Sequence, residues 1–446
     1  MNIIIAGDGE VGFHLAKSLS KVRHNITVID PHSELLAMLQ AEADLMTITG
    51  SSTSLSTLKE AGIASCDLLI AVLHEESINI ITCILGKRLG AKRTIARIST
   101  IEYLNDDNKQ MFKALGVDEI VSPERIAAKE ITNLLTRTTA TEIFDFANGL
   151  LSVYMMRVGS SAIVLDKTLT ESAKEHPDIE ARVVCIIRKG KTIIPDGNEK
   201  YLKGDLIYMI AKASSLDKIN ELGGRKDYNV KNAIIVGGGR VARRAALNLQ
   251  DKISLKIIEK DRDRCFDLTN MLANTMIING DGSDLSLLME EGLESTDAFI
   301  ALTDSTETNI LSCLHAHKHG VKKTIALVEN ISYIDVSQDI GIDTIINKKL
   351  TAASYIARFT LAANVTTSKW LAGMDAEVIE ILAKERSSVT KSKIRDLHIP
   401  YGASIGGVIR NNQAFITGGD FQIVAGDKVV VFTIPEAAAK IVKIFN

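Results

Sequence analysis

A glycine-rich segment near the start of the chain has the residue types and spacing that hold a pyrophosphate. A short apolar run, 2–6, leads into it, and a helical pattern follows. In that context the first glycine permits a tight turn, the second lets the backbone approach the phosphates, and the third packs helix against strand. The helix is therefore expected to present its amino end to a dinucleotide. The segment consists of Gly7, Asp8, Gly9, Glu10, Val11 and Gly12.

An acid stands where the adenosine ribose would lie. Asp30 ends the second apolar run, 21 residues after Gly9. A carboxylate at this place accepts hydrogen bonds from the ribose hydroxyls and repels a 2′-phosphate. The predicted ligand is therefore NAD(H) or another adenine nucleotide, and NADP is disfavoured.

The same signature returns later in the chain at a constant offset of 230 positions, which predicts an internal duplication with one complete nucleotide-binding unit in each half. The offset links Gly7 to Gly237, Gly9 to Gly239, Gly50 to Gly280, Asn79 to Asn309, Cys83 to Cys313 and Tyr103 to Tyr333. The second string consists of Gly237, Gly238, Gly239, Arg240, Val241 and Ala242, and Glu259 is its acid.

One difference between the two strings bears on ligand choice. Glu10 follows the second glycine in the first half, whereas Arg240 follows it in the second. A carboxylate there opposes a free terminal phosphate, and a guanidinium can bind one. The alternative, that both are solvated surface charges, stays open at this point.

Further candidates lie at the carboxyl ends of later strands, where open parallel sheets bind ligands. Arg97 closes the fifth strand and either meets a phosphate or forms a structural ion pair. No metal site is expected from the three histidines at 315, 317 and 319, because the first half has Leu85, Lys87 and Leu89 there. The other candidates are Gly50, Leu73 and His74 in the first half and Gly280, Thr303 and Asp304 in the second.

Short β-branched runs alternate with helical patterns in each half, which is typical of an α/β doubly wound parallel sheet. Turn-rich strands then indicate a small α+β module after each sheet. The predicted domains are 1–138, a Rossmann-like sheet; 139–225, a small module; 230–364, a second Rossmann-like sheet; and 365–446, a second small module. The helices at about 124–136 and 348–363 are candidates for crossing between lobes.

Composition excludes several classes of protein. The 446 residues carry a net charge of −3, and no clustered basic face indicates nucleic-acid binding. No apolar run approaches the roughly 18–20 residues that span a bilayer, so we expect a cytosolic chain. Five scattered cysteines fit reduced, buried thiols.

A catalytic set is not recognisable in the sequence. A dehydrogenase needs a proton donor at the nicotinamide, yet the small modules contain only His176 and His398 as histidines. The alternatives to a sensor are an NAD-dependent oxidoreductase of the amino-acid dehydrogenase kind and, ranked last, a redox-sensing transcription factor, for which no basic recognition helix is visible.

With these motifs in place, the chain resembles the TrkA family, the regulatory subunits of Trk-type bacterial potassium uptake systems, built from two tandem RCK (regulator of potassium conductance) units. The resemblance is carried by the string 7–12, Asp30, and the segments 61–62, 67–72, 79 and 95–98. It implies NAD(H), ATP or ADP as regulatory ligands and no catalytic residues. In related regulators an arginine at the place of Arg240 contacts the γ-phosphate of ATP. Leu73 and His74 depart from the small hydroxyl residues that family members often carry.

The resemblance also implies an assembly. Several copies would form a ring beneath a TrkH-like membrane potassium-translocating subunit, on the inner face of the cell membrane. Four copies would supply eight nucleotide lobes.

Overall fold

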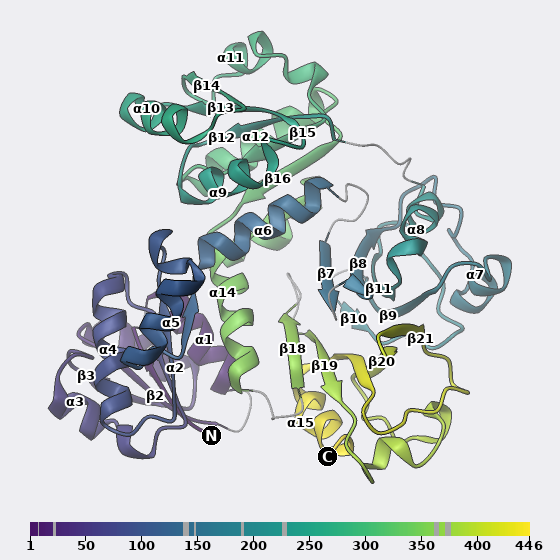
Figure 1. Ribbon diagram of the computed structural model, residues 1–446. Helices are drawn as coiled ribbons and strands as arrows, with labels where there is room; N and C mark the ends of the chain where they lie inside the picture. The colour runs from purple at the N-terminus through teal and green to yellow at the C-terminus, as the bar shows by residue number, and fades with distance from the viewer. Residues whose placement is uncertain are drawn as a thin grey trace. The chain divides into compact units, whose positions relative to one another are not determined.

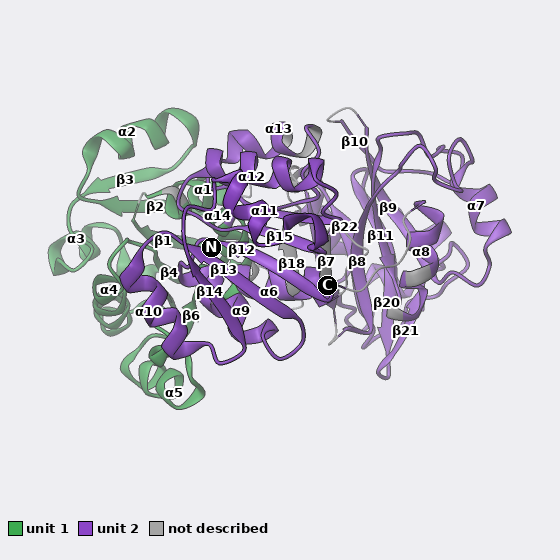
Figure 2. Ribbon diagram, turned by 90° about the horizontal axis from the view of Figure 1, so that it is seen from above, with its two compact units in different colours: residues 1–126, 348–362 green, residues 127–347, 363–446 purple. Residues whose placement is uncertain are grey.

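The computed structural model describes residues 1–7, 9–20, 24–136, 142–146, 149–188, 191–224, 230–360, 365–370 and 376–446. The chain divides into two compact units (Figure 2). Unit 1 comprises 1–126 and 348–362, and unit 2 comprises 127–347 and 363–446. These units are not the four predicted domains, whose boundaries stay a prediction.

Unit 1 contains a six-stranded parallel sheet with the order β3-β2-β1-β4-β5-β6, which we call the sheet of lobe one. Its strands β2 and β3 are labelled in Figure 1. The order reverses between β1 and β4, and such a reversal opens a ligand crevice at the carboxyl ends of those strands. The strands are β1 (Asn2–Ala6), β2 (Asn25–Asp30), β3 (Met46–Thr49), β4 (Leu68–Ala71), β5 (Arg93–Arg97) and β6 (Glu119–Val121). The helices between them are α1 (Glu10–Ser20), α2 (Ser33–Glu42), α3 (Leu55–Glu60), α4 (Glu76–Arg88) and α5 (Asp106–Leu115).

The last helix of unit 1 comes from the second half of the chain. α14 (Lys348–Ala357) packs against α1 and β6. The Arg93 guanidinium lies 4.9 Å from the centroid of the Phe359 ring, which follows α14. The sequence predicted this helix to continue to 363, but it ends at Ala357 and a 3₁₀ turn, Arg358–Thr360, follows.

Unit 2 contains a second parallel sheet, that of lobe two, with the order β14-β13-β12-β15-β16-β17. This order repeats that of lobe one strand for strand, which confirms the predicted duplication of the sheet. The strands are β12 (Asn232–Val236), β13 (Ser254–Glu259), β14 (Thr275–Asn279), β15 (Ala298–Ala301), β16 (Lys323–Leu327) and β17 (Thr344–Ile346). The helices are α9 (Arg240–Leu249), α10 (Arg262–Met271), α11 (Leu285–Glu290), α12 (Thr306–Lys318) and α13 (Ile334–Asp339).

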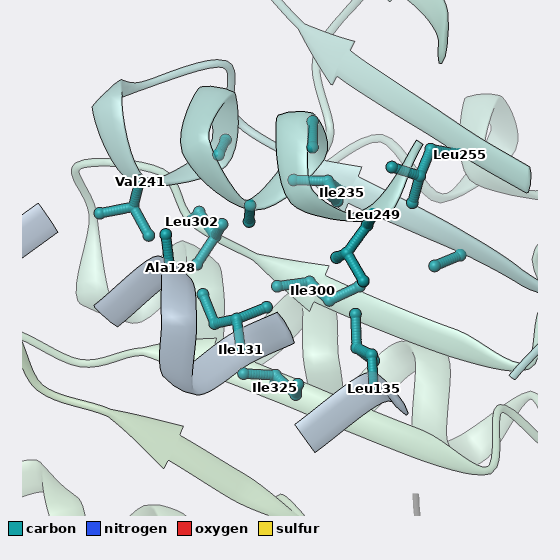
Figure 3. Close-up of a cluster of buried hydrophobic side chains, with 14 of the residues drawn as sticks. Ala128, Ile131, Leu135, Ile235, Val241, Leu249, Leu255, Ile300, Leu302 and Ile325 are labelled. Carbon is teal, nitrogen blue, oxygen red and sulfur yellow. The ribbon is translucent and has the colours of Figure 1, made fainter. Parts of the chain in front are cut away.

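A helix of the first half completes the core of lobe two. α6 (Pro123–Thr136) begins in unit 1, and its residues from 127 onward belong to unit 2. There Ile131 and Leu135 are buried among side chains of the sheet and of α9, including Ile300 and Leu249 (Figure 3). Since α14 packs in lobe one and α6 packs in lobe two, the prediction that these helices cross between lobes is confirmed.

The two small modules are five-stranded sheets with one common strand order, β10-β9-β11-β8-β7 and β21-β20-β22-β19-β18. The first module contains β7 (Glu142–Phe146), β8 (Leu151–Arg157), α7 (Leu169–Glu175), β9 (Ala181–Arg188), β10 (Lys191–Ile193), β11 (Leu206–Ala211) and α8 (Leu216–Leu222). The second contains β18 (Val365–Trp370), β19 (Glu377–Leu382), β20 (Ala403–Arg410), β21 (Gln413–Ile416), β22 (Lys428–Thr433) and α15 (Pro435–Ile444). The sequence missed β7, α7, β18 and α15.

The small modules share a hydrophobic core within unit 2. Tyr208 and Ile210 of the first module belong to the same buried cluster as Val430 of the second. A Cβ added at Gly406 would lie 2.1 Å from Cδ1 of Ile210, so a larger residue there would force the Ile210 side chain to move. Nη1 of Arg182 also donates a 2.6 Å hydrogen bond to the Thr417 carbonyl.

An ion pair with a buried aspartate recurs in both small modules. In the first, Nε and Nη2 of Arg188 donate to the two carboxylate oxygens of Asp205 at 3.0 and 2.9 Å. In the second, Arg410 makes the same bidentate contact with Asp427 at 2.8 and 2.7 Å. Each aspartate follows a glycine in a turn, Gly204-Asp205 or Gly426-Asp427, so its carboxylate ties that turn to a strand. Within the described ranges, no helix is long and apolar enough to cross a membrane.

Candidate functional site

The glycine-rich turn of lobe one joins β1 to α1 by a close approach to the end of β4. Gly7 has a φ of 108°, and a Cβ on it would lie 2.9 Å from the amide nitrogen of Leu73. A Cβ on Gly12 would lie 1.8 Å from the Gly7 carbonyl oxygen, so the third glycine is required here. A Cβ on Gly9 would meet no atom within 4 Å, which leaves this side of the turn open to a ligand. Asp8 and the side chain of Glu10 lie outside the described residues.

The turn of lobe two repeats this geometry. Gly237 has a φ of 91°, and a Cβ on it would lie 3.0 Å from the amide nitrogen of Thr303. A Cβ on Gly239 would again meet nothing within 4 Å. Ala242 is fully buried where lobe one has its third glycine, so this turn admits a methyl group. Val241, like Val11 in lobe one, is buried.

The two predicted ribose acids end β2 and β13. Asp30 is only 5 % exposed, and its Oδ1 accepts hydrogen bonds from the backbone amide and from Nδ1 of His32, at 2.9 and 2.8 Å. Glu259 is 4 % exposed, and its Oε1 accepts from the Asp261 amide at 2.8 Å. Its Oε2 accepts from the Gly238 amide at 2.6 Å. The acid of lobe two is thus bonded to the phosphate turn itself.

In each lobe, a glycine that follows the third strand is hydrogen-bonded to the backbone of the predicted ribose acid. The amide of Gly50 donates to the Asp30 carbonyl oxygen, and that of Gly280 donates to the Glu259 carbonyl oxygen, each at 3.0 Å. The structure therefore brings the predicted phosphate turn, acid and third-strand glycine together at the carboxyl ends of the strands in each sheet.

A buried asparagine fixes the opposite wall of each crevice. Oδ1 of Asn79 accepts from the Leu73 amide at 2.8 Å, and its Nδ2 donates to the carbonyl oxygens of Leu73 and Arg97 at 3.0 Å. Asn309 makes the same three contacts with Thr303 and Leu327. The sequence showed the pair only as repeat-related positions, and that repetition was the available signal for a shared role.

The remaining predicted residues lie on the rim. His74 and Asp304 are exposed beside this wall. Arg97 ends β5, and its Nη2 lies 3.7 Å from Oε1 of the buried Glu124. Arg97 therefore forms the structural ion pair that the sequence offered as one alternative. Its contact with a ligand phosphate stays a prediction.

The two sites differ in the charged residues around them. Lobe two carries Arg240 at the start of α9, and it is exposed. Arg264 of lobe two lies 3.4 Å from Oε2 of Glu259, where lobe one has Leu35 at the same distance in sequence from its acid. Arg243, in the first turn of α9, was also missed by the sequence reasoning, and its repeat-related counterpart is Phe13.

One cysteine lies beside the acid of lobe two, since Sγ of Cys265 donates to the Glu259 carbonyl oxygen at 3.3 Å. All five cysteines are buried as free thiols. Burial raises the pKa of Cys66 to about 11 and that of Cys185 to about 12, so both stay protonated near neutral pH. Burial also raises the pKa of Cys83 and of Cys313, which occupy repeat-related places.

A cavity of about 680 Å³ in unit 2 lies away from the crevice. It is lined by residues at the amino-terminal ends of the strands, among them Lys231, Ser254 and Asn274, and by the end of α6 at Leu135. In this fold ligands bind at the carboxyl ends of the strands. The cavity is therefore separate from the candidate site.

Comparisons with known proteins agree with the geometry. The model of the TrkA-N domain matches residues 3–123 and 233–348, and that of the TrkA-C domain matches 378–446. The Trk system potassium uptake protein TrkA of Haemophilus influenzae is 34 % identical over 437 residues, which cover 97 % of this chain and 95 % of that protein. TrkA homolog 1 of Methanosarcina mazei is 31 % identical over 459 residues and is covered completely, as is this chain.

Solved structures show the same fold at low identity. The structure described as the GsuK RCK domain matches with a TM-score of 0.62 at 16 % identity, covering 100 % of this chain and 94 % of that one. A GsuK channel bound to NAD matches with a TM-score of 0.61 at 17 % identity, covering 99 % and 78 %.

Proposed function

Because this chain belongs to the TrkA family of Trk system potassium uptake proteins, we propose that it is a regulatory subunit that senses nucleotides and gates a potassium-transporting membrane protein. The observation that carries the proposal is the repeated arrangement at the carboxyl ends of the strands, where both lobes have a glycine turn open to a ligand and a buried acid. Relatives covered over almost their whole length are named as potassium uptake proteins.

The proposed ligands are adenine nucleotides, with a different preference in each lobe. Lobe one takes NAD(H) or ADP, since Glu10 opposes a free terminal phosphate. Lobe two takes ATP, since the exposed guanidinium of Arg240 stands at the start of α9, where the helix dipole also favours an anion. The structural neighbour that holds NAD supports a dinucleotide in this fold.

The protein binds its nucleotides without converting them. Within the described residues, no three His, Cys, Asp or Glu side chains gather into a metal-binding group. A site of this kind acts through its different affinities for two conformations, which is what allosteric control requires. A spectrophotometric screen with amino, hydroxy and keto acids should detect no oxidation or reduction of the nicotinamide. Turnover of any of these substrates would contradict the proposal and favour the oxidoreductase alternative.

The proposed assembly is a cytoplasmic ring of four copies, with eight lobes, beneath a TrkH-like membrane subunit. Both lobes expose apolar side chains at repeat-related places, Ile81 with Leu311 and Ile101 with Ile331. Apolar side chains that recur at the same exposed places of a duplicated domain favour contacts between like surfaces. Light scattering should give a mass above that of the monomer at micromolar concentration.

The direct test of the proposed function is binding. NADH, NAD, ATP and ADP are titrated in parallel against the purified chain by calorimetry. We expect two sites per chain with different nucleotide preferences. Failure of all four to bind would contradict the proposal.

A further inference from the structure

Two charged side chains hold the phosphate turn of lobe two by its backbone. Oε2 of Glu259 accepts from the Gly238 amide at 2.6 Å, in a buried contact. Nε of Arg243 donates to the Gly238 carbonyl oxygen at 3.2 Å. The peptide groups on both sides of the Gly238 α-carbon are therefore fixed by hydrogen bonds to ionic partners, which are stronger than neutral ones.

The Arg243 contact also sets the direction of the next amide. The carbonyl of Gly238 and the N–H of Gly239 belong to one planar trans peptide, in which they point in opposite directions. Holding the carbonyl toward Arg243 therefore aims the Gly239 N–H away from it. No described residue accepts a hydrogen bond from this amide, and the glycine faces open space. The amide is thus available to an anion at the amino end of α9.

Arg243 is placed for this role by helix geometry. Side chains of a helix lean toward its amino end, so a residue in the first turn reaches back over the preceding turn of chain. Its side chain is 25 % exposed, and its other contact is a 3.7 Å pair with Asp267, which is 68 % exposed. An exposed ion pair at this distance contributes little to stability. The hydrogen bond to the Gly238 carbonyl is therefore the contact that fixes the Arg243 side chain.

Lobe one differs in sequence at the position of this arginine. Phe13 stands 230 positions before Arg243, and its ring has no hydrogen-bonding group. We propose that Arg243 is a positioning residue that orients the Gly239 amide for the nucleotide phosphates of lobe two. The inference rests on the proposed nucleotide site and adds to it a residue that shapes the turn.

The test compares variants in an Asp30→Ala background, in which lobe one binds weakly. Arg243→Met should lower the affinity of lobe two for ATP and for ADP alike, by about ten-fold, because both ligands place phosphates at the turn. Arg243→Lys, which keeps a charged donor, should recover part of the loss. Arg262→Met, an exposed arginine over the Phe266 ring on α10, is the matched control and should bind as the parent does.

Hydrogen exchange gives a readout that does not need a ligand. Without nucleotide, the Gly238 amide, which donates to Glu259, should exchange faster in Arg243→Met than in the parent, because the turn is then held by one ionic partner fewer, while the core amides of β12 stay protected. If Arg243→Met left both the nucleotide affinities and the amide exchange rate unchanged, the inference would be overturned. A loss of affinity for ATP but not for ADP would also overturn it, because it would indicate a direct contact between Arg243 and the terminal phosphate. Failure of the parent to bind any nucleotide would instead contradict the proposed function. Should Arg243→Met not fold, Arg243→Lys and Arg243→Gln carry the same comparison.

Discussion

At the residue scale, the two acids show what spacing predicts and what it leaves out. Asp30 and Glu259 lie where the distance from the glycine string placed them, at the ends of β2 and β13. Among the described residues, the ring of His32 contacts Asp30, and the Gly238 amide donates to Glu259. Such contacts depend on rotamers and on the path of the turn, which a spacing rule does not contain.

Removing the acid of lobe one tests its assignment. Asp30→Ala deletes charge-assisted hydrogen bonds to the ribose, each worth about 1.5–3 kcal/mol, so the affinity of lobe one for NAD and ADP should fall about ten-fold or more. Calorimetry measures both ligands. Asp107→Ala, an exposed carboxylate on α5, is the control and should change nothing. Full occupancy with unchanged affinity in Asp30→Ala would remove Asp30 from the site.

The terminal phosphate is tested at Arg240. Arg240→Ala should lower the affinity of lobe two for ATP more than that for ADP, because a guanidinium bonded to a phosphate makes a strong, charged contact that ADP would lack. Competition between ATP and ADP at that site measures the ratio directly. An equal loss for both nucleotides, or none, would make Arg240 a solvated surface charge.

At the element scale, the parallel sheets were predictable because their buried strands are continuous apolar runs between helices. The edge strands β7 and β18 of the small modules were not, since an edge strand can be short and polar and its pattern is weak. α7 did have a readable start, because Thr168 and Glu171 form a capping box at its amino end. The packing of α6 within lobe two depends on contacts distant in sequence, so a sequence pattern could only suggest it.

The contribution of α6 to lobe two can be measured. Ile131 is fully buried in the core cluster of this lobe, so Ile131→Ala should destabilise it by about 2–5 kcal/mol through lost burial and the cavity left behind. Urea unfolding, followed by hydrogen exchange in β12 and β15, locates the loss. Leu115→Ala, at an exposed position of α5, should stay within about 0.5 kcal/mol. Equal stability of the two variants would contradict the packing of α6 in lobe two.

At the scale of the whole molecule, duplication supplies two crevices of one geometry and lets their charges diverge. Glu10 and Phe13 stand in lobe one where Arg240 and Arg243 stand in lobe two. Each lobe contains a helix from the other half of the chain. Different ligands in the two lobes can therefore bias one conformational equilibrium in two ways, provided that each ligand binds the two conformations unequally. The sequence alone indicated this duplication, whereas the bonding of Glu259 and Arg243 to the turn became visible only in the structure.

The central claim is that nucleotide binding to this chain controls potassium movement through a membrane partner. The measurement is potassium flux into vesicles that contain the reconstituted partner and this protein, with ATP, ADP or NADH added at concentrations that saturate the sites found by calorimetry. The account predicts a flux that differs between nucleotides and loses that difference in the Asp30→Ala, Arg240→Ala double variant. A flux that is the same with every nucleotide and without any, while the sites are occupied, would contradict it.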